Sequence, residues 1–384
     1  MKICRPILGA CLFAAASMLT FHAAYALNGP TSIQIDGGPL GPLQLSGGVD
    51  GYGYYLSGTN SNGHPTGNTP VAANVGSAMI QLQKATGQLQ FTLEIGSIGG
   101  AIPLGAQNGR IAQTSVKTYV TGPIYKGYVT IAPTDSPITI SAGQLGSVEG
   151  WESSIDWYNA SQLTTDMWYV ENSQSRGVSA SYTKGPISAT VEFGDGFDTG
   201  VFNFLQAIAT YTINPTNSLT IYGAANLGAT GPNTFSYGGG NTGYANNFVN
   251  SQMIGGYYNY TIGNLSLVPE VQYVKSKIYH KLGLDTPSSN FGTAVFADYS
   301  LGSDSPYSIG GWVEYEKSLG QYFWFIAPRS EAVGIAVSPT WQYKYLFARA
   351  NLGGLYVLNN TASYGSSGSG KGVFLGTLEA GLLF

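Results

Sequence analysis

The sequence is poor in charged residues, in cysteine and in long apolar runs. Only 9% of its residues are charged, where about a quarter is usual for a soluble domain. Beyond residue 26, no apolar stretch approaches the 18 or so residues that a membrane-spanning helix needs. These two observations exclude a helical membrane protein and argue against an ordinary soluble domain.

The N-terminus has the features of an export signal. Lys2 and Arg5 precede an apolar run over residues 7–21, and Ala24-Tyr25-Ala26 has the small-residue form that signal peptidase recognises. We therefore expect residues 1–26 to be a cleaved signal peptide and residues 27–384 to form one exported domain. A lipoprotein signal at 8–11, LGAC, is the alternative, but the apolar run continues beyond it.

Removal of this segment changes the chemistry that is available. Both cysteines, Cys4 and Cys11, are lost with it, so the exported chain has neither a disulfide framework nor a thiolate site. Without Lys2 and Arg5, 14 of the 16 basic residues remain against 20 acidic ones, a formal charge of −6. This balance argues against nucleic acid as a partner.

The sequence is rich in glycine and tyrosine, and its apolar residues alternate with polar ones. In "GQLQFTLEI" (87–95), "PISATVEF" (186–193) and "YSIGGWVEYE" (307–316), one face is apolar and the other polar, which is typical of strands with two different environments. Counting such segments predicts sixteen strands, at 43–56, 77–85, 87–96, 123–132, 138–146, 174–184, 187–195, 202–212, 218–228, 250–262, 265–276, 291–301, 306–317, 331–341, 345–357 and 372–384.

The connections between these segments fall into two classes. Connections after even-numbered strands are short and contain turn residues, whereas those after odd-numbered strands are mostly long. An even number of strands with short turns at one edge and long loops at the other is the pattern of a bacterial outer-membrane barrel. The sequence therefore predicts an all-β fold, a transmembrane antiparallel up-and-down β-barrel with short periplasmic turns and long extracellular loops.

The last predicted strand ends on Phe384, in the apolar register of Leu378, Ala380 and Leu382. This places Phe384 at the lipid interface of a closed barrel. In this respect the chain resembles Gram-negative outer-membrane barrels, in which a terminal Phe is the signal read by the barrel assembly machinery. The resemblance implies an assembly role for Phe384, and outer-membrane lipid and lipopolysaccharide as surroundings.

Residues 140–182 carry a narrower resemblance. A strand that ends in Ala-Gly-Gln (142–144) leads into an acidic aromatic loop with Glu149, Trp151 and Asn159, and Gly177-Val178 opens the next strand. This segment resembles the OmpL-like β-barrel porin family. The resemblance implies a porin-type barrel without specifying a substrate.

A sixteen-stranded barrel is wide enough to hold water. We therefore expect a porin for passive diffusion of small hydrophilic solutes or ions, without cofactor or metal, and homotrimeric like many porins of this size. With apolar residues outward, the predicted pore-lining charges are Asp50, Glu94, Lys126, Glu192, Glu270, Asp298, Glu314, Glu316, Arg349 and Glu379. Eight acids against two bases predict a modest preference for cations.

The third long connection, 147–173, is the candidate constriction loop. Its charged residues are all acidic: Glu149, Glu152, Asp156, Asp166 and Glu171. By analogy with sixteen-stranded porins it could fold into the lumen, and an exposed acidic loop is the alternative.

Other readings of the sequence are weaker. A structural or adhesive barrel with a plugged lumen is the alternative function.

An enzyme would need a general base with a pKa near neutral pH, and the exported chain offers only His64 and His280, both in predicted loops. "GSSGSGKG" (365–372) lacks the helix of a phosphate-binding loop, and "GDGFDTG" (194–200) lacks the spacing of a calcium loop, so that a solvated turn is favoured.

Tyrosines are predicted on both faces of the strands. A set in the apolar register is expected to form an interfacial girdle: Tyr125, Tyr258, Tyr260, Tyr299, Tyr315 and Tyr356. A second set takes the polar register and includes the candidates for stacking on a solute: Tyr52, Tyr128, Tyr222, Tyr257 and Trp312.

Overall fold

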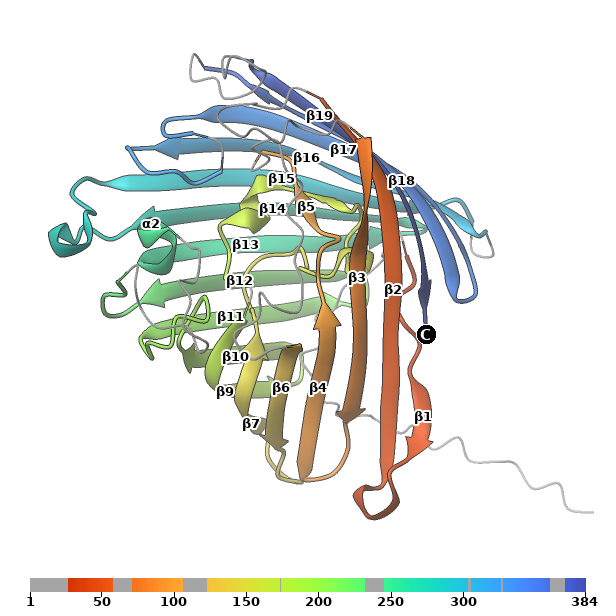
Figure 1. Ribbon diagram of the computed structural model, residues 1–384. Helices are drawn as coiled ribbons and strands as arrows, with labels where there is room; N and C mark the ends of the chain where they lie inside the picture. The colour runs from red at the N-terminus through yellow and green to blue at the C-terminus, as the bar shows by residue number, and fades with distance from the viewer. Residues whose placement is uncertain are drawn as a thin grey trace, which may run out of the picture.

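The computed structural model of the chain describes residues 27–57, 71–105, 123–172, 174–231, 245–302, 305–325, 327–359 and 370–384. Sixteen antiparallel strands close into a barrel (Figure 1). In chain order they are β2 (Pro42–Ser57), β3 (Val71–Lys84), β4 (Leu89–Ser97), β6 (Ile124–Ile131), β7 (Ile138–Gly146), β9 (Gln174–Lys184), β10 (Ile187–Gly194), β11 (Phe204–Asn214), β12 (Asn217–Asn226), β13 (Ser251–Ile262), β14 (Leu265–Ser276), β15 (Ser288–Ser300), β16 (Tyr307–Leu319), β17 (Glu331–Tyr343), β18 (Leu346–Val357) and β19 (Gly372–Leu383).

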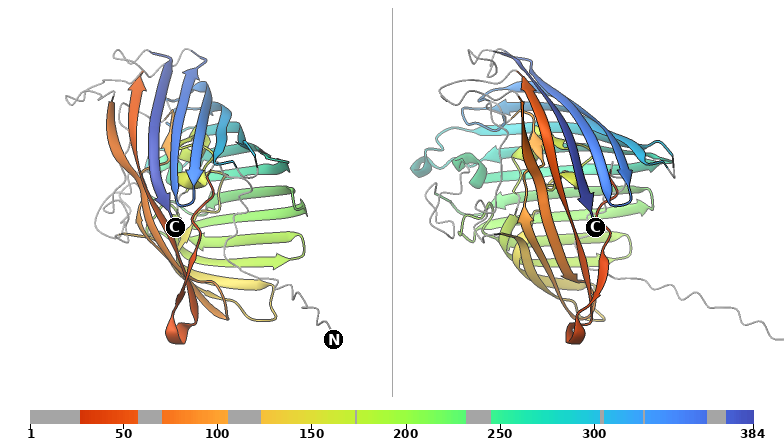
Figure 2. Two further views of the ribbon diagram at one scale, coloured as in Figure 1. Left: turned by 90° about the vertical axis from the view of Figure 1, so that its right-hand side faces the viewer. Right: turned by 45° about the vertical axis from the view of Figure 1, so that its right-hand side comes forward.

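The barrel closes between its first and last strands. β19 pairs with β2 from Leu383 opposite Gly48 to Phe374 opposite Ser57. Phe384 continues the ladder, because its amide and carbonyl exchange hydrogen bonds with those of Gly47 at 2.9 and 2.8 Å. The short strand β1 (Ile33–Asp36) pairs with the start of β2, next to this end of β19 (Figure 2). Closure leaves no free edge within the sixteen-stranded sheet.

All sixteen predicted strands are confirmed, several with the same bounds. The largest difference is β3, which begins at Val71 where the pattern predicted residue 77. Three short strands were not predicted, namely β1, β5 (Ile102–Pro103) and β8 (Leu163–Thr164). Neither were the one-turn helices α1 (Asp166–Tyr169) and α2 (Asn246–Val249). In the described part of the chain, no helix has the length and hydropathy required to cross a bilayer.

Side-chain exposure alternates along the strands as the sequence pattern predicts. In β16, Tyr307, Ile309 and Val313 are exposed, whereas Trp312 and Glu314 are buried. The exposed apolar side chains cover the outside of the barrel, where a bilayer would receive them, and the polar register points inward. A fold with an apolar exterior and a polar interior cannot be a soluble sandwich, whose interior is apolar.

The two edges of the barrel differ in the length of their connections. One edge has tight turns such as 185–186 and 263–264, in which Gly185 and Gly263 adopt positive φ of 60° and 57°. Such backbone favours glycine and matches the twist of two-residue hairpins. The other edge carries the long connections, of which 147–173 is described almost completely. The alternation of short and long connections is therefore confirmed.

Candidate functional site

The loop 147–173 crosses the interior of the barrel. It leaves β7 and returns at β9, yet it contacts strands halfway round the ring. The indole Nε1 of Trp312 on β16 donates to the carbonyl of Leu163 at 2.6 Å, and the amide of Asp166 donates to Oε2 of Glu314 at 2.8 Å. The loop therefore spans the lumen, which decides between the two placements that the sequence left open.

A second line of contacts fixes the loop to β18. The Arg349 guanidinium donates to the carbonyl oxygens of Asn159 at 2.9 Å and Asp156 at 3.2 Å. The amide of Gln162 donates to Oδ1 of Asn351 at 3.1 Å. These donors and acceptors are buried, so each hydrogen bond satisfies a polar group that would be costly to bury without a partner.

A segment of the preceding long connection enters the barrel beside this loop. Strand β5 pairs in parallel with β8, with Ile102 opposite Leu163. The amide of Gly105 then donates to Oδ1 of Asp166 at 2.7 Å. Two connections thus meet inside the lumen, and sequence periodicity gave no sign of this because each strand has only two residues.

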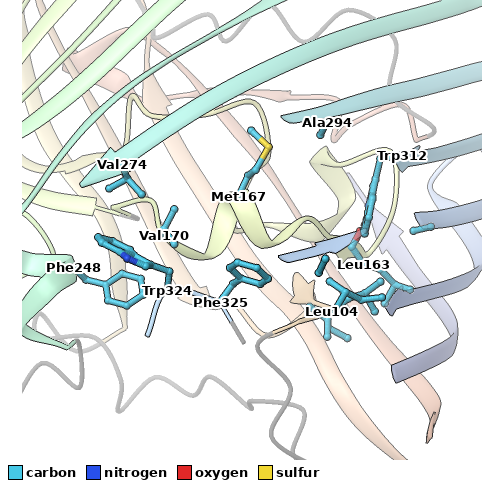
Figure 3. Packing of buried hydrophobic residues seen from close by; sticks show 14 of the residues in the cluster. Leu104, Leu163, Met167, Val170, Phe248, Val274, Ala294, Trp312, Trp324 and Phe325 are labelled. Carbon is cyan, nitrogen blue, oxygen red and sulfur yellow. The ribbon is translucent and has the colours of Figure 1, made fainter. Parts of the chain in front are cut away.

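Apolar side chains from these connections pack together inside the barrel (Figure 3). Leu104, Leu163 and Val170 are fully buried, and Met167 of α1 lies among them. Inward residues of the wall and of other connections complete the cluster, including Phe248, Val274, Ala294, Trp312, Trp324 and Phe325. Sequence analysis missed this cluster, which narrows the space that remains for solutes.

The predicted pore-lining charges all lie on inward strand faces, and nine of them are buried: Asp50, Glu94, Glu192, Glu270, Asp298, Glu314, Glu316, Arg349 and Glu379. Lys126 is less enclosed and pairs with Glu94 at 3.0 Å. Arg349 pairs with Glu379 at 2.9 Å through Nε and at 3.0 Å through a terminal nitrogen. The two bases are therefore already matched to two of the eight acids.

Most of the remaining wall carboxylates accept hydrogen bonds from neutral groups. Glu270 accepts from the Tyr222 hydroxyl at 2.7 Å, and Glu316 accepts from the Asn290 amide. Among the described residues, no basic side chain forms an ion pair with Glu270, Glu314 or Glu316. When these three carboxylates are ionised, no protein cation among the described residues balances their charge.

Four of the five loop acids are buried and Glu152 is half-buried, and most of them accept hydrogen bonds. Glu149 accepts from the Asn172 amide at 2.9 Å, and Glu152 accepts from the Thr165 amide at 2.9 Å. Glu171 accepts from Gln272 on β14 at 2.8 Å. Burial raises the pKa of Glu149 and the pKa of Glu152 to about 8 each, with the hydrogen bonds acting in the opposite direction.

Two predictions about individual residues were wrong. Tyr125 was predicted to face outward, but it is buried inside the barrel. A β-bulge explains the difference, because Ile124 pairs with Ile95 and Lys126 with Glu94, so Tyr125 is an extra residue that turns inward. The acidic turn 194–200 is not solvated either: Asp195 is buried and binds the Arg176 Nε at 2.8 Å.

The structure also places the inward aromatic residues and one of the two histidines. Tyr52, Tyr222 and Trp312 are buried on the inward face, as their register predicts. His280 lies in an exposed turn, with its Nδ1 2.8 Å from Oδ1 of Asp285. His64 lies outside the described residues, as do the segments 1–26 and 360–369.

Residues 42–384 match the model of a family described as "Putative beta-barrel porin-2, OmpL-like". The chain belongs to this porin family. No curated protein matches the porin in sequence. Its fold is nevertheless shared by solved outer-membrane porins, and the porin is an integral outer-membrane β-barrel.

Three solved structures illustrate this shared fold. The anion-selective porin from Comamonas acidovorans is 13% identical with a TM-score of 0.60, over 89% of this chain and 99% of that one. The outer membrane channel DcaP of Acinetobacter baumannii is 11% identical with a TM-score of 0.56, over 89% and 97%. OmpF of Salmonella typhi, solved with daunomycin, is 13% identical with a TM-score of 0.55, over 92% and 100%. At these identities the likeness extends to the fold alone.

Proposed function

We propose that this porin forms a narrow, water-filled channel through which small hydrophilic solutes diffuse passively, with a modest preference for cations. The observation that carries the proposal is the row of inward carboxylates at Glu270, Glu314 and Glu316, which has no basic partner among the described residues. Charge on the wall of a narrow path with low-dielectric surroundings concentrates counter-ions. Rings of carboxylates in channels favour cations for this reason.

The loop 147–173 would act as the constriction. Its backbone is fixed to Glu314 and Arg349 on the far wall. Its own acids Glu149, Glu152 and Glu171 line the path there and add negative charge as they ionise with rising pH. The apolar cluster beside it reduces the free cross-section. Both features favour the passage of small solutes over large ones.

The sign of the selectivity rests on this chain's own residues. The Comamonas porin is described as anion-selective, but 13% identity transfers no charge pattern. Single-channel recording on purified protein separates the proposed pore from a plugged structural barrel. Stable open steps in potassium chloride support the pore, whereas repeated reconstitution of folded barrel without conductance would contradict it.

The proposed partners follow from the outer-membrane location. Lipid and lipopolysaccharide would cover the apolar exterior, and the barrel assembly machinery would receive the closing strand. We infer a homotrimer as well, with a subunit contact at the outer face near the closing strands, where a hollow of about 920 Å³ is bordered by small residues such as Gly53, Ala73, Ala350 and Ala380. Light scattering in detergent tests this inference, and a monomer would contradict it.

The barrel needs no catalytic group for passive diffusion, and we infer that it is not an enzyme. His280 is exposed and pairs with Asp285, which is also exposed. Replacing both His64 and His280 by Gln should leave the conductance unchanged. Hydrolysis of a lipid or peptide bond by the wild type that is lost in this variant would contradict the inference.

A further inference from the structure

Three buried carboxylates meet where the internal loop reaches the closing strands of the barrel. Asp50 comes from β2, Asp156 from the loop 147–173 and Glu379 from β19. One oxygen of each lies within 4.8 Å of one oxygen of both others. Their side chains are 4%, 0% and 2% exposed, so water does not reach them as it reaches surface acids.

The hydrogen bonds at this cluster leave specific oxygen atoms without a partner. Glu379 is saturated by Arg349 and Asn351. Asp50 Oδ1 accepts from the Ser77 amide at 2.5 Å, but Oδ2 has no partner among the described residues. Both carboxylate oxygens of Asp156 lack one as well, although this side chain is completely buried. A buried carboxylate without any partner is costly, and native proteins rarely retain one.

Two glycines leave the space that two of these carboxylates occupy. A Cβ on Gly100 would lie 2.0 Å from Cγ of Asp156, and a Cβ on Gly76 would lie 1.8 Å from Oδ2 of Asp50. Any other residue at these positions would displace the carboxylate. The space around the unpartnered oxygens therefore depends on the absence of two side chains.

The guanidinium of Arg349 does not satisfy these oxygens. Its donors go to the Glu379 carboxylate and to the main-chain carbonyls of Asp156 and Asn159. Three carboxylates and one guanidinium leave a net charge of −2 when all are ionised. A divalent cation would neutralise that charge and supply the missing partner for each free oxygen.

We propose that Asp50, Asp156 and Glu379 bind one calcium ion, which ties the internal loop to the closing strands β2 and β19. All three donors are oxygen atoms, which suits a hard cation, and oxygens within 4.8 Å of one another can share an ion at the usual calcium distances of about 2.3–2.6 Å. Water would complete the coordination. The rival explanation is a proton shared between Asp50 and Asp156.

Terbium luminescence tests the site directly, because terbium replaces calcium and Trp157 adjoins Asp156 as an energy donor. The protein would be refolded in detergent without lipopolysaccharide, stripped with EDTA and titrated with terbium. We expect saturable emission that calcium displaces, with affinity weakened about tenfold or more in Asp156→Asn and Asp50→Asn, since calcium affinity follows the ligand charge. The exposed acid Asp285 provides the control variant, Asp285→Asn, which should bind as the wild type does.

Melting provides a second readout, and its wild-type arm does not depend on whether the variants fold. Calcium should raise the Tm of the wild type and of Asp285→Asn, and should leave that of Asp156→Asn and Asp50→Asn unchanged. Wild-type protein with neither terbium emission nor a calcium-dependent Tm would overturn the proposal. Equal responses in the wild type and in Asp156→Asn would overturn it too, because the ion would then lie elsewhere.

Discussion

Arg349 and Glu379 face each other across β18 and β19, and neither side chain is exposed to solvent. The same guanidinium holds two carbonyl groups of the internal loop. One side chain therefore neutralises a wall carboxylate and anchors the loop that crosses the lumen. Its removal would affect both.

We predict that Arg349→Ala destabilises the folded barrel, by about 3–5 kcal/mol, because it leaves Glu379 buried and unpaired. The measurement is the temperature at which the barrel loses its heat-modifiable gel mobility. Arg329→Ala, at an exposed position, is the control. Arg349→Ala with Glu379→Gln should recover part of the loss, since the orphaned charge is removed. Equal stability of the two single arginine variants would contradict the prediction.

Phe384 should be required for assembly. Its main chain completes the β2 ladder at Gly47, and its ring lies on the outer face beside that glycine. Replacing it with Asp places a charge at the lipid interface, so we expect export to the periplasm with little folded barrel in the outer membrane. Phe384→Tyr should assemble normally. Wild-type amounts of folded Phe384→Asp would show that the assembly signal lies elsewhere.

The orientation of the barrel can be tested with single cysteines, because the expected exported chain has none. Asp135 and Thr216 lie in short turns, and Asp285 lies in a longer connection at the other edge. An impermeant maleimide should label Asp285→Cys on intact cells and should label the two turn variants only after lysis. Tags at 240 and 365, which lie outside the described residues, should also be reachable. Labelling at 216 on intact cells would reverse the orientation.

The cation preference should increase between pH 6 and pH 9. Glu149 and Glu152 have pKa values raised by burial to about 8, so both are largely neutral at pH 6 and ionised at pH 9. Reversal potentials at the two pH values measure the change, and Glu149→Gln with Glu152→Gln should show a smaller one. A preference that falls with pH would contradict this assignment.

The same pKa shifts predict the direction of a stability change. The folded loop binds these two protons more tightly than an unfolded chain, in which Glu titrates near 4.5. Their contribution to stability is therefore fully present below about pH 4.5 and is lost as the pH rises through about 8. Replacing both residues with Gln should flatten the dependence of the Tm on pH in this window.

The strands and their faces could be predicted because one physical cause determines them. Lipid outside and polar groups inside produce an alternation with a period of two residues, and β16 follows it from Tyr307 to Glu316. The inward orientation of Tyr125 could not be predicted, because a bulge adds one residue to the strand without any change in composition. The inward apolar cluster was not predicted because Val373 and Leu375 flank Phe374 on β19, so that both faces of this strand segment are apolar and alternation cannot identify the inward one.

The site depends on contacts that sequence patterns do not record. Asp166 and Glu314 are 148 residues apart, and Arg349 and Asn159 are 190 apart. Acidic composition identified the loop, but its path across the barrel follows from pairing partners on the far wall. The same is true of Asp50 and Asp156, whose proximity requires the closed ring.

The reversal potential of single channels in a potassium chloride gradient tests the central claim most directly. The account predicts a reversal potential with the sign that indicates cation preference, and a cation-to-anion permeability ratio of several-fold. This ratio should be lower at high salt, where screening shortens the reach of the wall charges. Glu314→Gln with Glu316→Gln should reduce it, and Asp285→Asn should not. An anion-selective channel, or a cation preference unchanged in the Glu314 and Glu316 variant, would contradict the account.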